Sequence, residues 1–286
     1  MRSDFAAWVM RGRKEARHIS PIPIVETKAL TRRYGDLTAV DGIDLSIRAG
    51  EVFGLLGPNG AGKTTVIKML TTLLPPTSGT ALVAGFDIDR QPSHVRAAIG
   101  YVPQLVSVDG TLTAYENLLI FAKLYGVPRP ERRERIAASL EFVGLEEAAH
   151  RMVRGYSGGM MRRLEIALAM LHRPRVLFMD EPTVGLDPLA RQAVWERVQL
   201  LVHQFGMTIF LTTHFMEEAD HLCHRVAIMN LGHVAALGRP EDLKVSIGKA
   251  EATLDEVFAH YTGHQLDTGG DFREISRTRQ TIARRG

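Results

Sequence analysis

The chain has 286 residues and a mass of 31.7 kDa, which suits one or two domains with a sizeable buried core. Hydrophobic residues make up 45% and charged residues 23%, and these ordinary proportions argue against a largely disordered chain or a membrane protein. No stretch approaches the roughly 18 consecutive apolar residues that span a bilayer, and the basic N-terminal segment lacks the apolar core of a secretory signal. Cys223 is the only cysteine, so a disulfide framework and a cysteine-rich zinc site are excluded and a reducing compartment is expected.

The charge is nearly balanced, with 35 basic and 32 acidic residues and a net charge of +3. The basic excess gathers at the two ends of the chain, at Arg2, Arg11, Arg13, Lys14 and Arg17 and at Arg273, Arg277, Arg279, Arg284 and Arg285. Solvated, mobile tails are the simplest interpretation of this distribution. Contact with an anionic membrane surface or with nucleic acid is the alternative, and no motif supports either one.

Apolar periodicity and turn residues predict an order of strands and helices along the chain. Strands are expected at 24–30, 45–47, 51–56, 80–83, 99–102, 175–180 and 208–213, with turns at 34–36 and 41–42. Helices are expected at 63–74, 114–125, 131–143, 160–172 and 189–204, with shorter ones at 240–246 and 254–261. Thr113 and Glu116 predict a capping box that opens the helix at 114–125.

The alternation of strands with helices predicts an α/β fold with a parallel sheet. The chain turns helical from about 105 to 170, and this block at about 105–172 is expected to form an inserted subdomain. We therefore divide the chain into a basic arm at 1–23, a main unit at 24–240 and a partly disordered C-terminal extension at 241–286.

A glycine-rich segment predicts a phosphate-binding loop. Gly57-Pro58-Asn59-Gly60-Ala61-Gly62-Lys63-Thr64 fits the pattern G-x-x-x-x-G-K-[ST], and it follows an expected strand and precedes an expected helix. Small residues let backbone N–H groups converge on phosphate oxygens, and the helix N-terminus adds its dipole. Lys63 should then reach the β- and γ-phosphates, and the Thr64 hydroxyl should be a Mg²⁺ ligand.

Two acidic residues end the apolar strand at 175–180 and predict the second half of a magnesium site. A strand this apolar lies in the middle of a sheet, so Asp180 should emerge at the edge where α/β proteins bind ligands. Asp180 is expected to hold Mg²⁺, mainly through water. Glu181, one residue further on, can polarise an attacking water as a general base.

The segment Tyr156-Ser157-Gly158-Gly159-Met160 resembles the signature of the ATP-binding cassette (ABC) ATPases, a family that the chain resembles from about 24 to 238. Further motifs follow in the order of the family. Tyr34 corresponds to the aromatic residue that stacks on adenine, Gln104 to the Q-loop glutamine, Val184-Gly185-Leu186-Asp187 to the D-loop and His214 to the switch histidine.

The resemblance implies a P-loop cassette with a mixed RecA-like core, an N-terminal antiparallel β part and an inserted helical subdomain. It implies ATP and Mg²⁺ as cofactors and ATP hydrolysis as the activity. The implied nucleotide-binding residues are Tyr34, Gly57, Pro58, Asn59, Gly60, Ala61, Gly62, Lys63, Thr64, Thr65, Gln104, Ser157, Gly158, Gly159 and Asp187. The implied Mg²⁺ ligands are Thr64, Gln104 and Asp180, and the implied catalytic residues are Glu181, His214 and Lys63.

The signature segment also has a direct physical interpretation. Ser157 is a good N-cap for the helix that follows, and Gly158 and Gly159 expose backbone N–H groups that make a second anion site. In the family this site binds the γ-phosphate of the ATP held by the other subunit, which implies a homodimer or a heterodimer with a related chain. The commonest signature is Leu-Ser-Gly-Gly-Gln, and Met160 cannot make the amide hydrogen bonds of its glutamine.

The run from Tyr156 to Ala167 and the tail at 252–263 resemble the subfamily of drug-resistance and other ABC-2-type exporters. This resemblance implies an ATPase subunit that drives a separate transmembrane permease, with a drug, a lipid or a polysaccharide-like molecule as cargo. We expect a cytoplasmic protein held at the inner face of the membrane by its permease, with no membrane span of its own and no nucleic-acid partner. The alternatives are a non-transport ABC ATPase, a regulatory module with negligible turnover and a nucleotide kinase.

Some residues keep two interpretations. Asp187 is either a contact across a dimer or the cap of the following helix, and both roles are compatible. The apolar residues at 118–121 and 124–125 are either core or a docking face for the permease. A metal site at His221, Cys223 and His224 is disfavoured, because the spacing is too tight for a tetrahedral ligand set.

Overall fold

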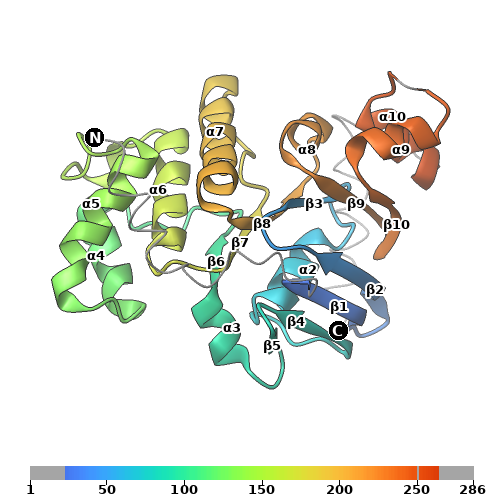
Figure 1. Cartoon of the computed structure of the whole chain (residues 1–286), viewed down its shortest axis with the longest axis horizontal. Helices are drawn as coiled ribbons and strands as arrows, with labels where there is room; N and C mark the ends of the chain where they lie inside the picture. Colours follow the sequence, from blue (N-terminus) through green and yellow to red (C-terminus); the bar gives the residue numbers. More distant parts are fainter. Residues whose placement is uncertain (1–22, 250, 264–286) are drawn as a thin grey trace, which may run out of the picture.

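The computed structural model describes residues 23–249 and 251–263, which form two β-sheets with helices packed around them (Figure 1). An antiparallel sheet has the spatial order β2 (Leu37–Ile47), β1 (Val25–Tyr34), β4 (Ser78–Val83) and β5 (Phe86–Asp87). A six-stranded sheet has the order β10 (His233–Gly238), β9 (Arg225–Asn230), β3 (Val52–Leu56), β8 (Thr208–Thr213), β7 (Val176–Asp180) and β6 (Ile99–Val102). Neighbours in this second sheet are parallel except for β9 and β10, so the predicted α/β fold with an antiparallel part is confirmed.

The helices fall into groups around these sheets. Their bounds are α2 (Lys63–Leu70), α3 (Pro92–Ala98), α4 (Ala114–Leu124), α5 (Arg132–Val143), α6 (Gly158–Met170), α7 (Pro188–Phe205), α8 (Met216–Leu222), α9 (Pro240–Ser246) and α10 (Leu254–Thr262), with short 3₁₀ turns η1 (Arg129–Glu131) and η2 (Val153–Gly155). Helices α4, α5 and α6 gather at one end of the molecule, and α9 and α10 lie at the opposite end beside β10 (Figure 1). The expected capping box is present at the start of α4, where Thr113 and Glu116 bond each other's backbone N–H groups.

The central strands β3, β7 and β8 of the six-stranded sheet are buried on both faces, and alternate residues of β7 and β8 enter different cores. Phe178 of β7 and Phe210 of β8 point to the side of α2 and the antiparallel sheet, where their rings lie 5.4 Å apart. Leu177 and Leu211, one residue away, point to the side of α6, α7 and α8. This burial explains the nearly continuous apolar sequence of β7 and β8, and it holds the carboxyl ends of both strands in place for the site.

Two expected boundaries are wrong. The first helix ends at Leu70 rather than at residue 74, because Thr72 adopts a left-handed conformation with a φ of 62° before Pro75 is reached. The expected turn at Asp41 and Gly42 lies inside β2, where Gly42 has a φ of 60° and the pairing with β1 shifts register. A glycine at a register shift marks a β-bulge. Bulges and turns favour the same residue types, so the sequence alone did not distinguish them.

The start of the predicted helical block is also wrong, since residues 105–112 form loop and turn structure and helix begins only at Ala114. Five elements were not expected from the sequence: β5, α3, α8, β9 and β10. β5, α3 and α8 are short, and β10 alternates only weakly in burial, so these four elements have no clear periodic pattern. β9 has a buried apolar run at 226–229, which sequence reasoning missed.

The predicted division into arm, main unit and extension stays a prediction. Residues 1–22 and 264–286 lie outside the described residues and carry most of the basic excess at the two ends. Among the described residues, no helix has both the length and the apolar character that a membrane crossing requires.

Candidate functional site

The loop between β3 and α2 depends on glycine at two close approaches. A Cβ atom at Gly57 would lie 2.2 Å from the Met229 carbonyl oxygen, and one at Gly62 would lie 2.4 Å from the Ala39 carbonyl oxygen. Gly62 also has a φ of 107°, and no side chain caps the first turn of α2. The N–H groups of that turn are therefore open to an anion, which is the arrangement that the sequence predicted.

Lys63 directs its ammonium group into this loop. Its Nζ donates to the carbonyl oxygens of Gly57 at 2.7 Å and Pro58 at 3.0 Å, and it lies 3.1 Å from Glu181 Oε1. The Lys63 side chain is only 4% exposed. Burial lowers the pKa of Lys63, and the nearby carboxylates of Glu181 and Asp180 oppose this shift. The cation is therefore held in the loop by carbonyl oxygens and by Glu181.

Asp180 ends β7 directly beneath the start of α2. Its Oδ1 accepts hydrogen bonds from Thr212 Oγ1 at 2.6 Å and from Thr64 Oγ1 at 3.2 Å. Burial raises the pKa of the Asp180 carboxyl, and these two hydroxyl groups counteract the shift. A carboxylate and a hydroxyl at this separation are hard oxygen ligands of the kind that Mg²⁺ uses together with water and substrate phosphates, so the residues fit the predicted metal.

Glu181 lies at the centre of the polar cluster. Its Oε2 accepts from Gln104 Nε2 at 3.2 Å and lies 3.3 Å from His214 Nδ1, without the alignment of a hydrogen bond. Burial alone would raise the pKa of Glu181, but His214 and Lys63 together outweigh it, and the pKa is lowered. Glu181 is thus a carboxylate at neutral pH and can accept a proton. Its backbone has a φ of 47°, a left-handed conformation that is rare outside glycine.

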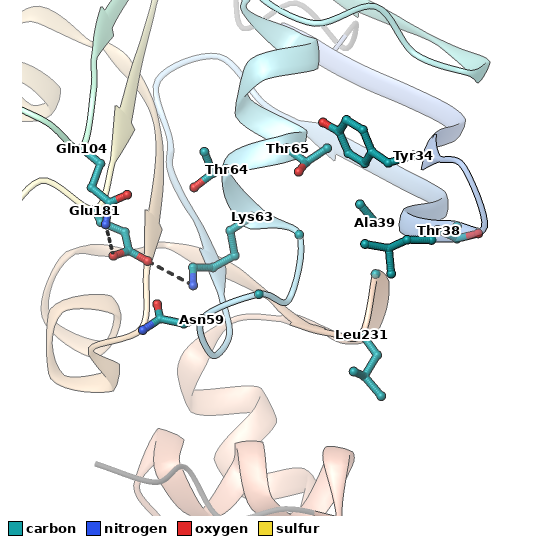
Figure 2. Close-up of a pocket in the computed structure, with 14 residues that line it drawn as sticks. Tyr34, Thr38, Ala39, Asn59, Lys63, Thr64, Thr65, Gln104, Glu181 and Leu231 are labelled. Carbon is teal, nitrogen blue, oxygen red and sulfur yellow. Dashed lines mark hydrogen bonds and ion pairs between the residues drawn. The ribbon is translucent and has the colours of Figure 1, made fainter. Parts of the chain in front are cut away.

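Of these groups, Lys63, Thr64, Gln104 and Glu181 line one cleft with a volume of about 940 Å³. Its lining consists of Tyr34, Leu37, Thr38, Ala39, Asn59, Gly60, Gly62, Lys63, Thr64, Thr65, Gln104, Glu181, Leu231 and Gly232. Figure 2 shows Tyr34, Thr38, Ala39 and Leu231 on one side of the phosphate loop, and Gln104 and Glu181 on the other. The cleft therefore has an apolar region with an aromatic ring and a separate polar region with titratable groups, as a nucleotide requires.

The predicted signature residues lie outside this cleft. Ser157 caps α6, where its hydroxyl accepts from the Met160 N–H at 3.2 Å, and Ser157 and Gly158 are exposed. Gly159 is buried, and a Cβ atom there would lie 2.7 Å from Ala190 Cβ at the start of α7. Asp187 caps α7 by accepting from the Ala190 N–H at 2.9 Å, so its predicted capping role is confirmed.

The remaining predicted residues support the cleft from behind. Gly57, Pro58 and Ala61 belong to the loop without lining the cleft, Asp180 lies under Thr64, and His214 lies beside Glu181. In the part of the chain that the structure describes, no cluster of three or more His, Cys, Asp or Glu side chains is placed to hold a metal ion.

Sequence reasoning missed Thr212 and five residues that line the cleft, namely Leu37, Thr38, Ala39, Leu231 and Gly232. Leu231, in the turn between β9 and β10, is 75% exposed, has a φ of 46° and lines the apolar part of the cleft. Thr212 connects Asp180 to Glu181, since its hydroxyl donates to Asp180 and accepts from the Glu181 N–H at 3.1 Å. A leucine beside a glycine and a threonine within a strand carry no signal that distinguishes them from ordinary structural residues.

Comparisons with known proteins agree with this geometry. Residues 40–184 match the ABC transporter family. The chain is 46% identical over 225 residues to the Nod factor export ATP-binding protein I of Ralstonia nicotianae, covering 79% of this chain and 70% of that protein. It is 46% identical over 228 residues to the daunorubicin/doxorubicin resistance ATP-binding protein DrrA of Streptomyces peucetius, covering 80% and 69%.

A solved structure has the same fold. It is a dimeric, post-hydrolysis state of the ATP-binding cassette MJ0796 bound to ADP and inorganic phosphate, with a TM-score of 0.67 and 27% identity over 75% of this chain and 98% of that chain. Sequence match, fold and the residues of the cleft agree, and the chain belongs to the ABC transporter family as an ATP-binding cassette ATPase.

Proposed function

We propose that this chain is the ATPase subunit of an ABC-2-type exporter and drives a separate transmembrane permease. The observation that carries the proposal is the position of Glu181, an ionised carboxylate in contact with Lys63, Gln104 and His214 at the phosphate loop. The family membership and the export and drug-resistance relatives support the transport role.

In this proposal the cleft binds ATP along its length. Tyr34 stacks on the adenine, because its ring is half-exposed at the apolar end of the cleft. The backbone of 57–65 cradles the phosphates, with Lys63 as their cation. Thr64, Asp180 and Gln104 hold Mg²⁺, which when bound neutralises charge on the phosphate oxygens.

Hydrolysis then depends on Glu181 as general base. Its carboxylate accepts a proton from the attacking water, the water oxygen bonds to the γ-phosphorus, and the bond to the ADP oxygen breaks. His214 Nδ1 lies 3.3 Å from Glu181 Oε2, the oxygen that also accepts from Gln104. We assign to His214 a contact with the γ-phosphate. The lowered pKa of Glu181 favours the ionised form that this step needs.

Dimerisation completes the site. Ser157 and Gly158 are exposed at the N-terminus of α6 and lie outside the cleft of their own chain, so they are available to an anion held by another chain. We infer that they bind the γ-phosphate in a partner cassette, either a second copy or a related chain, with Asp187 at the same interface. The dimeric state of the solved cassette supports this arrangement.

Ser157 offers a sharp test of the dimer. The variant Glu181→Gln should trap an ATP-bound dimer, detected by light scattering after size exclusion. Adding Ser157→Asp keeps a good N-cap but places a negative charge against the γ-phosphate bound by the partner cassette. The two negative charges repel each other, so the dimer should disappear. Ser157→Asn, a neutral cap of similar size, is the matched control and should retain it. A dimer that persists with Ser157→Asp contradicts the assigned contact.

The permease is tested by purification from native membranes with and without MgATP. Leu105 and Val106, in the loop that follows Gln104, are 81% and 49% exposed, and Leu124 at the end of α4 is 74% exposed. We infer that these exposed apolar residues dock the permease at the inner side of the membrane. Recovery of a polytopic membrane protein supports the exporter and gives access to its cargo, a drug, a lipid or a polysaccharide-like molecule. Recovery of ribosomal or DNA-repair components alone would contradict the exporter proposal and indicate a non-transport ABC ATPase.

A further inference from the structure

A buried ion pair lies within α6, the helix that begins at the signature segment. Arg162 and Glu165 are 3% and 2% exposed, and Arg162 NH1 lies 2.8 Å from Glu165 Oε2. Neither residue lines the cleft, and neither has a role in the predicted site, although both lie within the run from Tyr156 to Ala167. Both charges nevertheless lie in the interior, where charged groups need specific partners.

The partners lie in the loop that follows β6. The Arg162 guanidinium donates to the carbonyl oxygens of Pro103 at 2.6 Å and Gln104 at 2.9 Å. Glu165 Oε1 accepts from the backbone N–H of Ser107 at 2.7 Å and from its hydroxyl at 3.0 Å. The pair thus holds both ends of the segment 103–107 to α6. We call these two side chains, with their bonds to the loop, the strut.

The strut ends at the site. Gln104, whose carbonyl oxygen Arg162 binds, donates through its side chain to Glu181 Oε2 at 3.2 Å. We propose that Arg162 and Glu165 are positioning residues that set the place of Gln104 against Glu181 and the metal site, and so control the rate of ATP hydrolysis. The inference rests on the proposed function of Gln104 and extends it to two residues on another helix.

The chemistry of the pair favours positioning over stabilisation. A buried ion pair is often no more stabilising than apolar residues of the same volume, so stability alone does not account for it. The planar guanidinium binds two adjacent carbonyl oxygens at once, which fixes the orientation of the peptide between them. A lysine would carry the same charge but would lack this fixed fork.

The test compares the loss of rate with and without Gln104. Arg162→Met combined with Glu165→Met removes both charges together and leaves no unpaired ion in the core. We expect its kcat for MgATP to fall about tenfold or more through displacement of Gln104, with the KM for ATP within about twofold. In a Gln104→Ala background the same pair of changes should lower kcat by less than about twofold, because the positioned group is gone.

Two further variants sharpen the result. Arg162→Lys keeps the charge and should lower kcat with an unchanged unfolding temperature, while the half-saturating Mg²⁺ concentration rises. Glu131→Met with Arg135→Met removes the ion pair of 2.6 Å in the same helical group and should leave kcat unchanged. Hydrogen exchange at the Ser107 amide should be faster in the Arg162→Met, Glu165→Met double variant than in the control pair.

The outcomes separate the two proposals. Equal losses of kcat in the presence and absence of the Gln104 side chain would overturn the strut as a positioning device, because the pair would then act on the fold in general. A wild-type kcat for Gln104→Ala alone would overturn the proposed role of Gln104, and the strut proposal with it. A loss of kcat confined to the background that keeps Gln104, together with faster exchange at Ser107, supports both.

Discussion

Thr212→Val is the sharpest test of how the fold supports the site. Thr212 is fully buried in β8, and its hydroxyl donates to Asp180 Oδ1 at 2.6 Å. Valine has nearly the same shape, so the change removes this bond without a cavity. The Glu181 N–H loses one acceptor but keeps the Thr212 carbonyl oxygen at 3.1 Å. The loss is therefore concentrated on the Asp180 carboxylate, whose remaining hydroxyl donor is Thr64.

A hydrogen bond to a charged group contributes about 1.5–3 kcal/mol, so we expect the free energy of unfolding at pH 7 to fall by about 2 kcal/mol. Urea denaturation followed by circular dichroism measures this difference. The matched control is Thr208→Val on the same strand, which removes a neutral bond from the Gly50 N–H at 2.9 Å and should cost about 1 kcal/mol. A Thr212→Val protein as stable as the wild type, or more stable than the control variant, would refute this reasoning.

The loss of stability caused by Thr212→Val should also depend on pH. Burial already raises the pKa of Asp180 in the folded state, so the folded protein binds this proton more tightly than the unfolded chain. Stability from this group is consequently lost as the pH rises through the folded pKa. The Thr212 hydroxyl limits that loss because it stabilises the ionised carboxylate. Thr212→Val should therefore lower the free energy of unfolding substantially at pH 7 and much less below the folded pKa of Asp180. An equal cost at both pH values would contradict the assignment to the carboxylate.

Three other perturbations have defined outcomes. Burial lowers the pKa of His172 to about 4, so the unfolded chain binds more protons than the folded protein between pH 4 and 6.5. The free energy of unfolding should therefore fall by about 2 kcal/mol from pH 7 to pH 5. His172→Phe should remove this pH dependence, as measured by urea denaturation at the two pH values. Glu181→Gln should lower kcat by about 10²- to 10⁴-fold in a phosphate-release assay, and a variant retaining a tenth of the rate is incompatible with a general base. Leu231→Asn suits the left-handed backbone better, so the unfolding temperature should be unchanged or higher, while the Kd of a fluorescent ATP analogue should rise about three- to tenfold through loss of an apolar contact. If Leu231→Asn and the wild type bind that analogue with equal affinity, Leu231 does not contact the nucleotide.

The sequence was sufficient where neighbouring residues determine the structure. The phosphate loop was predicted because strand, glycine loop and helix are consecutive from Val52 to Leu70. The caps at Thr113, Ser157 and Asp187 follow the same logic, since each side chain bonds an N–H three residues away. Such interactions lie within one turn of the backbone, and residue type alone is enough to predict them.

The sequence was insufficient where partners are distant along the chain. The Arg162 contacts with the loop of Gln104 span 58 and 59 residues, and the Thr212 bond to Asp180 spans 32 residues. Their types were compatible with many environments, and only the parallel order of β7 and β8 brings Thr212 next to Asp180. The bulge at Gly42 was mistaken for a turn for a related reason, because pairing with β1 rather than composition decides between them.

The backbone of Glu181 shows why the site needs these distant contacts. A non-glycine residue with a φ of 47° costs of order 1–3 kcal/mol and persists only when its surroundings fix it. Glycine would relieve the strain but would remove the carboxylate, so the fold holds a strained residue instead. The Thr212 carbonyl and hydroxyl oxygens both accept from the Glu181 N–H at 3.1 Å, while Lys63 and Gln104 contact its side chain. Strand β8 and the phosphate loop thus fix, from opposite sides, the residue that the proposed hydrolysis requires.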